Sequence, residues 1–197
     1  MATDIDSTIK AMVKYDLPGC PEGLIVQKVR EVAEDFFRRS TAWRQDLDTF
    51  VTVADQAEYT LTPPTNCIIG VVTKVTLDES EKHQSRYDFR DDSVLEFTSA
   101  PTEDDIDVVV SVIVFPTNAC ASYPDEVIDR WQRALADGVL GKLKSDPMSA
   151  TKPADWFEPA GGGLYSEKYE KAVANALNEM TTERKPDNVQ VVMPYFA

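Results

Sequence analysis

The chain has 197 residues, of which 43% are hydrophobic and 27% are charged, ordinary values for a globular protein that can bury one core. Its charge is unusual, because 34 acidic side chains against 20 basic ones give a net charge of −14. Such a surface repels nucleic-acid phosphates, which argues against a tight sequence-specific DNA reader but suits a conduit along which DNA slides. No stretch reaches the roughly 18 apolar residues of a membrane span, and residues 1–6 lack the basic and apolar regions of a signal peptide.

The three cysteines, Cys20, Cys67 and Cys120, lie far apart and form no Cys-x-x-Cys motif. This odd number of scattered thiols is typical of a protein in a reducing cytosol. It favours small buried thiols over metal ligands.

Apolar residues at helical spacing predict three long helices, over residues 21–39, 124–145 and 164–182. A short helix over 4–15 precedes them. The first two long helices open on a proline followed by acidic residues, which suits the positive end of the helix dipole.

Glycines mark two places in the helical segments. Gly138 and Gly141 lie inside the second long helix, where each lowers helix propensity by about 1 kcal/mol relative to alanine. We therefore expect another helix to approach closely there. The run Gly161–Gly163 precedes the third long helix and predicts a flexible joint at the end of a loop over 148–163.

The central part of the chain, residues 48–115, is rich in β-branched and aromatic residues between turn residues, which predicts five to six short strands in an antiparallel sheet or small sandwich. The polar stretch 78–85 is expected to be a turn or an exposed loop. The strongest strand signal is 106–115, which is nearly all β-branched and expected to be buried on both faces. The other expected strands cover residues 50–53, 59–61 and 68–77 and a hairpin formed by 87–89 and 94–97.

These elements predict an α+β fold: a helical bundle of three main helices with an inserted antiparallel β-rich subdomain and an extended C-terminal arm. Residues 1–47 and 116–183 form the bundle, 48–115 the β-rich insertion and 184–197 the arm.

Motifs for catalysis, cofactor binding or metal binding are not found in the sequence. There is no Gly-x-Ser-x-Gly, His-Glu-x-x-His or phosphate-binding Gly-rich loop. The single histidine, His83, lies in a polar stretch and is expected to be a solvated surface residue, since a catalytic base also needs an oriented partner and a cleft. We therefore expect no catalytic, cofactor or metal site, and no enzyme activity.

Two groups of residues point instead to contacts with other chains. Arg38, Arg39 and Arg44 form the one compact basic group in an acidic chain. They either balance the helix end and nearby acids or pair with a neighbouring subunit, and these readings have similar weight. The C-terminal segment is apolar and aromatic, which predicts docking on another chain through Val189, Val191, Val192, Met193, Tyr195 and Phe196.

The order of these features resembles the head–tail adaptor, or connector, proteins of tailed bacteriophages. The likeness covers about residues 18–183 and consists of loose patterns without invariant chemistry. It rests on these segments: Cys20-Pro21, Phe36-Phe37-Arg38-Arg39-Ser40, Trp43-Arg44, Asp48, Tyr59-Thr60-Leu61 and Tyr123-Pro124-Asp125.

The resemblance implies a structural virion protein located at the head–tail interface and assembled in the host cytoplasm. It implies a homo-oligomeric ring, commonly of twelve copies, bound to the portal protein above and to tail or nozzle proteins below. It also implies that the C-terminal segment reaches the portal or a neighbouring subunit, a role that the apolar residues Val189–Ala197 fit. Duplex DNA would pass through the lumen without sequence-specific binding, and no membrane or cofactor is involved. An acidic lining would keep DNA from adhering during packaging and ejection.

Two alternatives remain open. A tail-completion or terminator protein would also be acidic and would also assemble into a ring, but it would cap a tail tube. A small metal-dependent hydrolase would use the acidic residues Asp91, Asp92, Asp104 and Asp105, although their spacing does not match a calcium-binding loop and solvated turns are the simpler interpretation.

Overall fold

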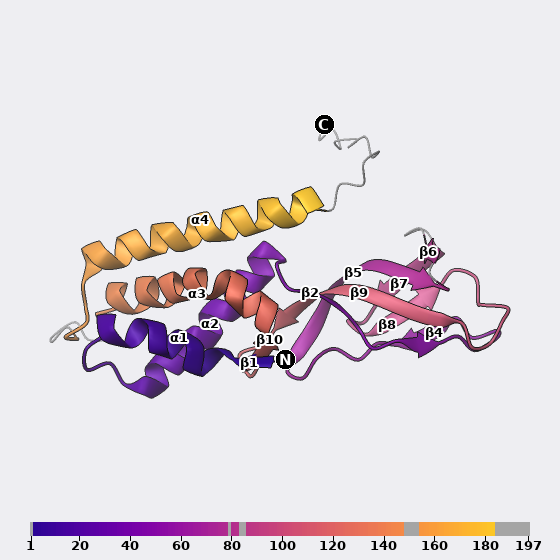
Figure 1. Cartoon of the computed structure of the whole chain (residues 1–197), viewed down its shortest axis with the longest axis horizontal. Helices are drawn as coiled ribbons and strands as arrows, with labels where there is room; N and C mark the ends of the chain where they lie inside the picture. Colours follow the sequence, from indigo (N-terminus) through magenta and orange to yellow (C-terminus); the bar gives the residue numbers. More distant parts are fainter. Residues whose placement is uncertain (1, 79, 83–85, 148–153, 184–197) are drawn as a thin grey trace.

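The structure, a computed structural model, describes residues 2–78, 80–82, 86–147 and 154–183. It confirms a mixed α+β chain with antiparallel strands, and Figure 1 shows an elongated molecule with the helices at one end and most strands at the other. His83 and the apolar C-terminal segment 189–197 lie outside the described residues.

Four α-helices among the described residues form the helical end. They are α1 (Ile5–Val13), α2 (Glu22–Ser40), α3 (Asp125–Ser145) and α4 (Pro159–Glu183), with a 3-10 turn at Lys14–Asp16 after α1. Each buries one apolar stripe, as the helical spacing predicts. The stripe of α2, which includes Phe36 and Phe37, is fully buried, and Trp131 of α3 packs against the Phe36 ring at 5.4 Å between centroids. Trp131 is therefore a core residue.

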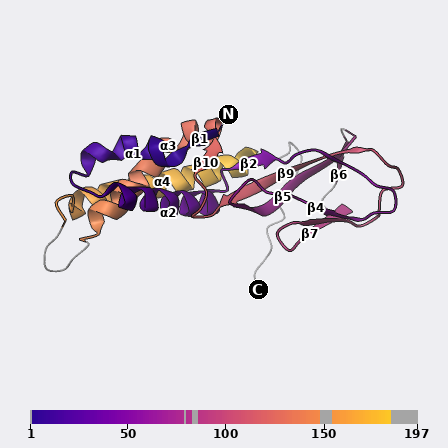
Figure 2. The same ribbon diagram turned by 90° about the horizontal axis from the view of Figure 1, so that it is seen from below.

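Helices α3 and α4 lie side by side along most of their length (Figures 1 and 2). Glycines and serines form the contact: Gly141 faces Ser166, and Gly162 faces Ser145. A Cβ atom added to Gly141 would lie 2.9 Å from the Ser166 backbone nitrogen. A Cβ atom added to Gly138 would lie 2.6 Å from the Cγ1 atom of Val32 in α2 and 2.7 Å from the Tyr169 ring in α4. The expected close approach of other helices at Gly138 and Gly141 is thus confirmed.

The prediction of a flexible joint at Gly161–Gly163 is wrong, because these residues lie inside α4, which begins at Pro159. Gly162 is buried against Ser145 and Lys144, and this tertiary contact outweighs the low helix propensity of a glycine run. The helix start is further fixed by Lys144, whose ammonium lies 2.7 Å from the carboxylate of Glu158.

The strands form three antiparallel sheets among the described residues. The largest has the order β2-β9-β5-β6, and β3 also pairs with β9. A second sheet has the order β4-β8-β7, and the third pairs β1 with β10 beside the helices. The strands are β1 (Ala2–Asp4), β2 (Arg44–Asp46), β3 (Phe50–Val51), β4 (Glu58–Thr60), β5 (Cys67–Leu77), β6 (Ser80–Lys82), β7 (Tyr87–Arg90), β8 (Val94–Phe97), β9 (Asp107–Pro116) and β10 (Ser122–Pro124).

The long pair of β5 and β9 dominates the strand region. Its register runs from Cys67 opposite Pro116 to Leu77 opposite Val108, with two irregularities near Gly70 and Thr73. In β9, the run Val112–Val114 is fully buried, whereas the first half of the strand alternates, so burial on both faces is confirmed only for its second half. The stretch 78–85 is not only a loop, because β6 within it returns to pair with the end of β5.

Aromatic rings connect the two ends of the molecule. Phe37 of α2, Trp43 and Tyr123 of β10 are each at most 1% exposed, and their ring centroids lie 4.9 to 5.9 Å apart. Offset and edge-on contacts of this kind add to the free energy of area burial. These three rings form a buried aromatic junction between α2, the residue before β2, and β10.

Candidate interface surfaces

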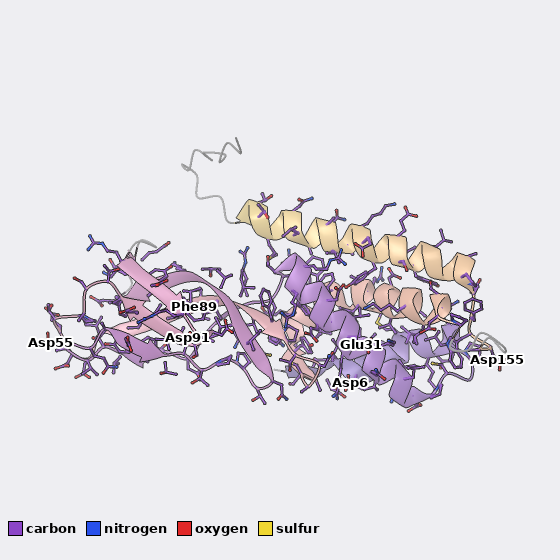
Figure 3. All side chains as sticks on the ribbon, turned by 180° about the vertical axis from the view of Figure 1, so that it is seen from behind. Asp6, Glu31, Asp55, Phe89, Asp91 and Asp155 are labelled. Carbon is purple, nitrogen blue, oxygen red and sulfur yellow. The ribbon has the colours of Figure 1, made fainter. Side chains whose placement is uncertain are left out.

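The acidic surplus of the chain is concentrated in the strand region. Residues 48–115 hold 14 acidic and 4 basic side chains, a net charge of −10, which leaves 20 acidic and 16 basic side chains for the rest. The strand region is thus strongly negative, whereas the rest of the chain, although longer, has a net charge of only −4. Figure 3 shows Asp55 at the far end of the strand region and Asp155 at the opposite end of the molecule.

Two turns meet at the far end of the strand region and hold acidic residues outward. The backbone N–H of Asp55 donates to the Pro101 carbonyl at 2.9 Å, and the Ala54 N–H donates to the Asp104 carboxylate at 2.7 Å. Asp55 and Asp105 adopt left-handed backbone conformations, with φ of 63° and 59°, which aspartate tolerates better than most residues. The result is an exposed acidic tip formed by Asp55 and Glu103–Asp105.

The acidic residues of the hydrolase alternative are spread over two turns. Asp91 and Asp92 lie in the turn between β7 and β8, and Figure 3 shows Asp91 away from the tip marked by Asp55. Within the described ranges, no group of three or more His, Cys, Asp and Glu residues is placed to hold a metal ion. The arrangement is that of solvated turns, with Asp104 engaged by a backbone N–H.

The three arginines of the basic group have partners within the chain. Arg39 of α2 forms ion pairs with Asp35 at 3.2 Å and with Glu170 of α4. The hydrogen bonds between Arg39 and Glu170 raise the pKa of Arg39, although burial opposes this shift by a smaller amount. The same hydrogen bonds lower the pKa of Glu170. The pair joins α2 to α4 on a surface where both side chains are about half exposed.

Arg38 and Arg44 lie on either side of the aromatic junction. Arg38 pairs with Glu34 at 3.2 Å, and its guanidinium lies 5.8 Å from the centre of the Phe115 ring in β9. Arg44 in β2 donates to the backbone carbonyl of Met180 near the end of α4, at 2.5 Å. The arginines thus tie α2, α4 and the first strands together, and the structure places all three near this junction.

A small cavity of about 170 Å³ opens beside Arg44 and Met180. Its other walls come from Ala42, the first turns of α3 and Trp131. It lies near the end of α4, which contributes Met180. The C-terminal residues predicted to dock, Val189, Val191, Val192, Met193, Tyr195 and Phe196, lie outside the described part of the chain.

The edges of the largest sheet carry exposed apolar side chains that the sequence analysis did not single out. Among the described residues, no strand covers β5 between Cys67 and Lys74 on the side away from β9, and β2 and β3 follow each other along the opposite edge. Val71 on the first edge is 43% exposed, and Val51 on the second is 44% exposed. An uncapped apolar edge is a common place for another strand to pair. The signal in the sequence was the run Ile68–Thr73, which contains no charge.

None of the helices in the described ranges is both long and apolar enough to cross a membrane. Comparison with protein-family models and with curated proteins finds no match for this chain. The case for a function therefore rests on the chain's own charges, edges and contacts.

Proposed function

We propose that this protein is a structural subunit of a homo-oligomeric adaptor ring, of about twelve copies, between the portal and the tail of a tailed bacteriophage. In this proposal residues 1–47 and 116–183 act as a helical bundle, 48–115 as an inserted β-rich subdomain, and 184–197 as an arm that contacts the portal or a neighbouring subunit. The protein acts as a scaffold and conduit, and not as an enzyme.

The observation that carries the proposal is the segregation of charge. A net charge of −10 at one end of an elongated subunit, repeated around a ring, would surround the bore with negative potential. Duplex DNA carries one negative charge per about 1.7 Å of its axis, so such a lining repels it at every point and lets it slide. The helical end carries less of the surplus negative charge, which leaves it suited to protein contacts.

The two edges of the largest sheet support head-to-tail assembly. The β5 edge and the β3 edge differ from each other, so pairing one with the other joins unlike surfaces, which is the kind of contact that closes into a ring. Both strands are antiparallel to β9 and therefore run in the same direction. In neighbours related by a small rotation, β5 of one subunit would pair in parallel with β3 of the next.

Assembly can be tested with the full chain, alone and mixed with purified portal rings of the phage that encodes it. We expect negative-stain images and native mass spectrometry to show a closed ring seated on the portal. A chain that stays monomeric with the portal contradicts the adaptor role. Rings that bind a tail tube and ignore the portal favour the tail-completion or terminator alternative instead.

The edge contact has a separate test. Val71→Lys places a charge on the β5 edge and is expected to abolish ring formation while leaving the melting temperature of the monomer nearly unchanged, since Val71 is 43% exposed. Leu164→Lys is the matched control, because Leu164 is 63% exposed on α4, away from both edges. Normal rings from the Val71 variant would exclude the edge contact without excluding the ring.

The role of the charge can be tested by gel mobility of a short duplex at physiological salt. The natural chain is expected to leave the duplex unshifted, whereas replacing Asp104 and Asp105 by lysine is expected to retard it in the assembled ring. Tight DNA binding by the natural chain would contradict the conduit.

Deleting Val189–Ala197 is expected to abolish portal binding and to preserve the helix content measured by circular dichroism.

A further inference from the structure

Two of the three cysteines, 53 positions apart in the sequence, are in direct contact. The Sγ atom of Cys67, at the start of β5, lies 3.6 Å from the Sγ atom of Cys120, in the turn between β9 and β10. Both thiols are buried, at 7% and 1% exposure, and both are free. The third cysteine, Cys20, is separate and only partly buried. We propose that Cys67 and Cys120 form a site of reversible oxidative cross-linking that closes into a disulfide.

The surrounding backbone already holds the two thiols in register. Asn66 accepts from the Thr117 N–H at 3.1 Å through its carbonyl, and its side-chain amide donates to the Ala119 carbonyl at 3.1 Å. The two turns that carry the cysteines are therefore bonded to each other independently of the sulfur atoms. A disulfide is about 2.05 Å long, so closure needs the sulfurs to move by about 1.5 Å, which small side-chain rotations supply.

The immediate environment makes the two thiols chemically unequal. A hydrogen bond from Cys67 lowers the pKa of the Cys120 thiol to about 7, against an opposing effect of burial. The same hydrogen bond, together with burial, raises the pKa of Cys67. Cys120 is thus the partner that forms a thiolate, which is the reactive state of a cysteine. Cys67 is the partner that attacks the oxidised Cys120 and completes the disulfide.

A small cavity lies beside residues that flank the two cysteines. It has a volume of about 280 Å³ and is lined in part by Thr65, Ser122 and Tyr123. The carbonyl oxygen of Thr65 lies 3.6 Å from the Cys67 sulfur, and that of Ser122 lies 3.5 Å from the Cys120 sulfur. Two residues of the cavity wall, Thr65 and Ser122, are therefore direct neighbours of the thiols.

The oxidant is a peroxide, and the reaction has two steps. The Cys120 thiolate attacks one peroxide oxygen, the oxygen–oxygen bond breaks, and hydroxide leaves, which gives a sulfenic acid. The Cys67 sulfur then attacks the Cys120 sulfur, the sulfur–oxygen bond breaks, and the hydroxyl group leaves as water with the thiol proton. In total, two thiols lose two hydrogen atoms and hydrogen peroxide becomes two waters.

The cross-link would fasten the point where the strand region meets the helices. Closing a chain loop of this length removes conformational freedom from the unfolded state, which predicts a melting temperature higher by roughly 10 °C. If the proposed function holds, the oxidising conditions would be met when assembled particles leave the reducing host cytoplasm. The chemistry itself does not depend on that function, because it needs only the isolated chain.

The test treats the reduced full chain with hydrogen peroxide, alkylates the remaining thiols and maps the peptides by mass spectrometry. The expected product has one alkylated thiol, at Cys20, and a Cys67–Cys120 link that a reductant reverses. Cys20→Ser should cross-link normally, whereas Cys120→Ser should not, with circular dichroism confirming that each variant folds. Three alkylated thiols after oxidation, sulfinic acid at Cys120 without a link, or links through Cys20 would each overturn the proposal, as would an unchanged melting temperature of the linked chain.

Discussion

Replacing Gly141 with alanine probes the contact between α3 and α4 directly. The added Cβ atom would lie 2.7 Å from the Oγ atom of Ser166, 2.9 Å from its backbone nitrogen and 3.2 Å from its Cα atom. Two of these three neighbours are backbone atoms of α4, so a change of rotamer cannot relieve the clash. The helices must move apart for the variant to fold.

Two effects oppose each other, and their magnitudes decide the outcome. Alanine is better than glycine in a helix by about 1 kcal/mol. Overpacking a well-filled contact costs about 1–3 kcal/mol, and rigid neighbours place Gly141→Ala at the upper end. We therefore expect a net loss of about 2 kcal/mol and a melting temperature lower by roughly 4–8 °C.

Gly163→Ala is the matched control, because Gly163 lies in α4 and nothing approaches its added Cβ atom within 4 Å. This variant gains helix propensity without a clash, so its melting temperature should rise by about 2–4 °C. Both variants can be compared with the natural chain by calorimetry and urea unfolding. Equal shifts of the same sign would refute the argument, because helix propensity alone would then explain both.

Three further predictions concern other parts of the fold. Trp43→Ala removes a ring that is 1% exposed and should lower the free energy of unfolding by about 3–5 kcal/mol in urea titrations; a loss below 1 kcal/mol would contradict the buried junction. A double-mutant cycle of Arg39→Ala and Glu170→Ala should give a coupling below about 1 kcal/mol, because both side chains are half exposed; a stronger coupling would show that this pair is not screened. Burial raises the pKa of Asp137, so the folded state binds its proton more tightly than the unfolded state and this residue adds stability as pH falls through the raised pKa. Asp137→Asn should therefore stabilise the protein at neutral pH and lose that advantage in acid, as measured by unfolding at a series of pH values.

Elements with a strong periodic pattern were predictable from the sequence, because packing and periodicity agree there. The predicted helix over 21–39 corresponds to α2, Glu22–Ser40, and the predicted strand over 106–115 corresponds to β9, Asp107–Pro116. The three-residue strands β1, β2, β6 and β10 were missed because so few residues carry no period, and they exist through pairing with distant partners. The same reason explains the error at Gly161–Gly163, whose helix depends on a contact with α3.

The candidate interface was predictable in composition and not in arrangement. The sequence indicated the basic group, and Asp35 lies at helical spacing from Arg39, but the second partner, Glu170, lies 131 positions away and no local pattern indicates it. The contact of Cys67 with Cys120 is equally invisible, because it arises from the register of β5 with β9. Apolar sheet edges become recognisable only once the strand order is known, since the same valines would be buried in a central strand.

The pairing of Cys67 with Pro116 has a further consequence for how this protein can vary. Residues 67–116 therefore begin and end side by side, where β5 starts and β9 ends. The hydrogen bond from the Thr117 N–H to the Asn66 carbonyl fixes the distance between these two ends. Lengthening a flexible loop costs only about 0.6 kcal/mol per doubling of its length. Insertions or deletions in distal turns such as 91–93 would therefore change the reach of the strand region without displacing α2 or α3. The length of the strand region and the packing of the helices can thus change independently of each other.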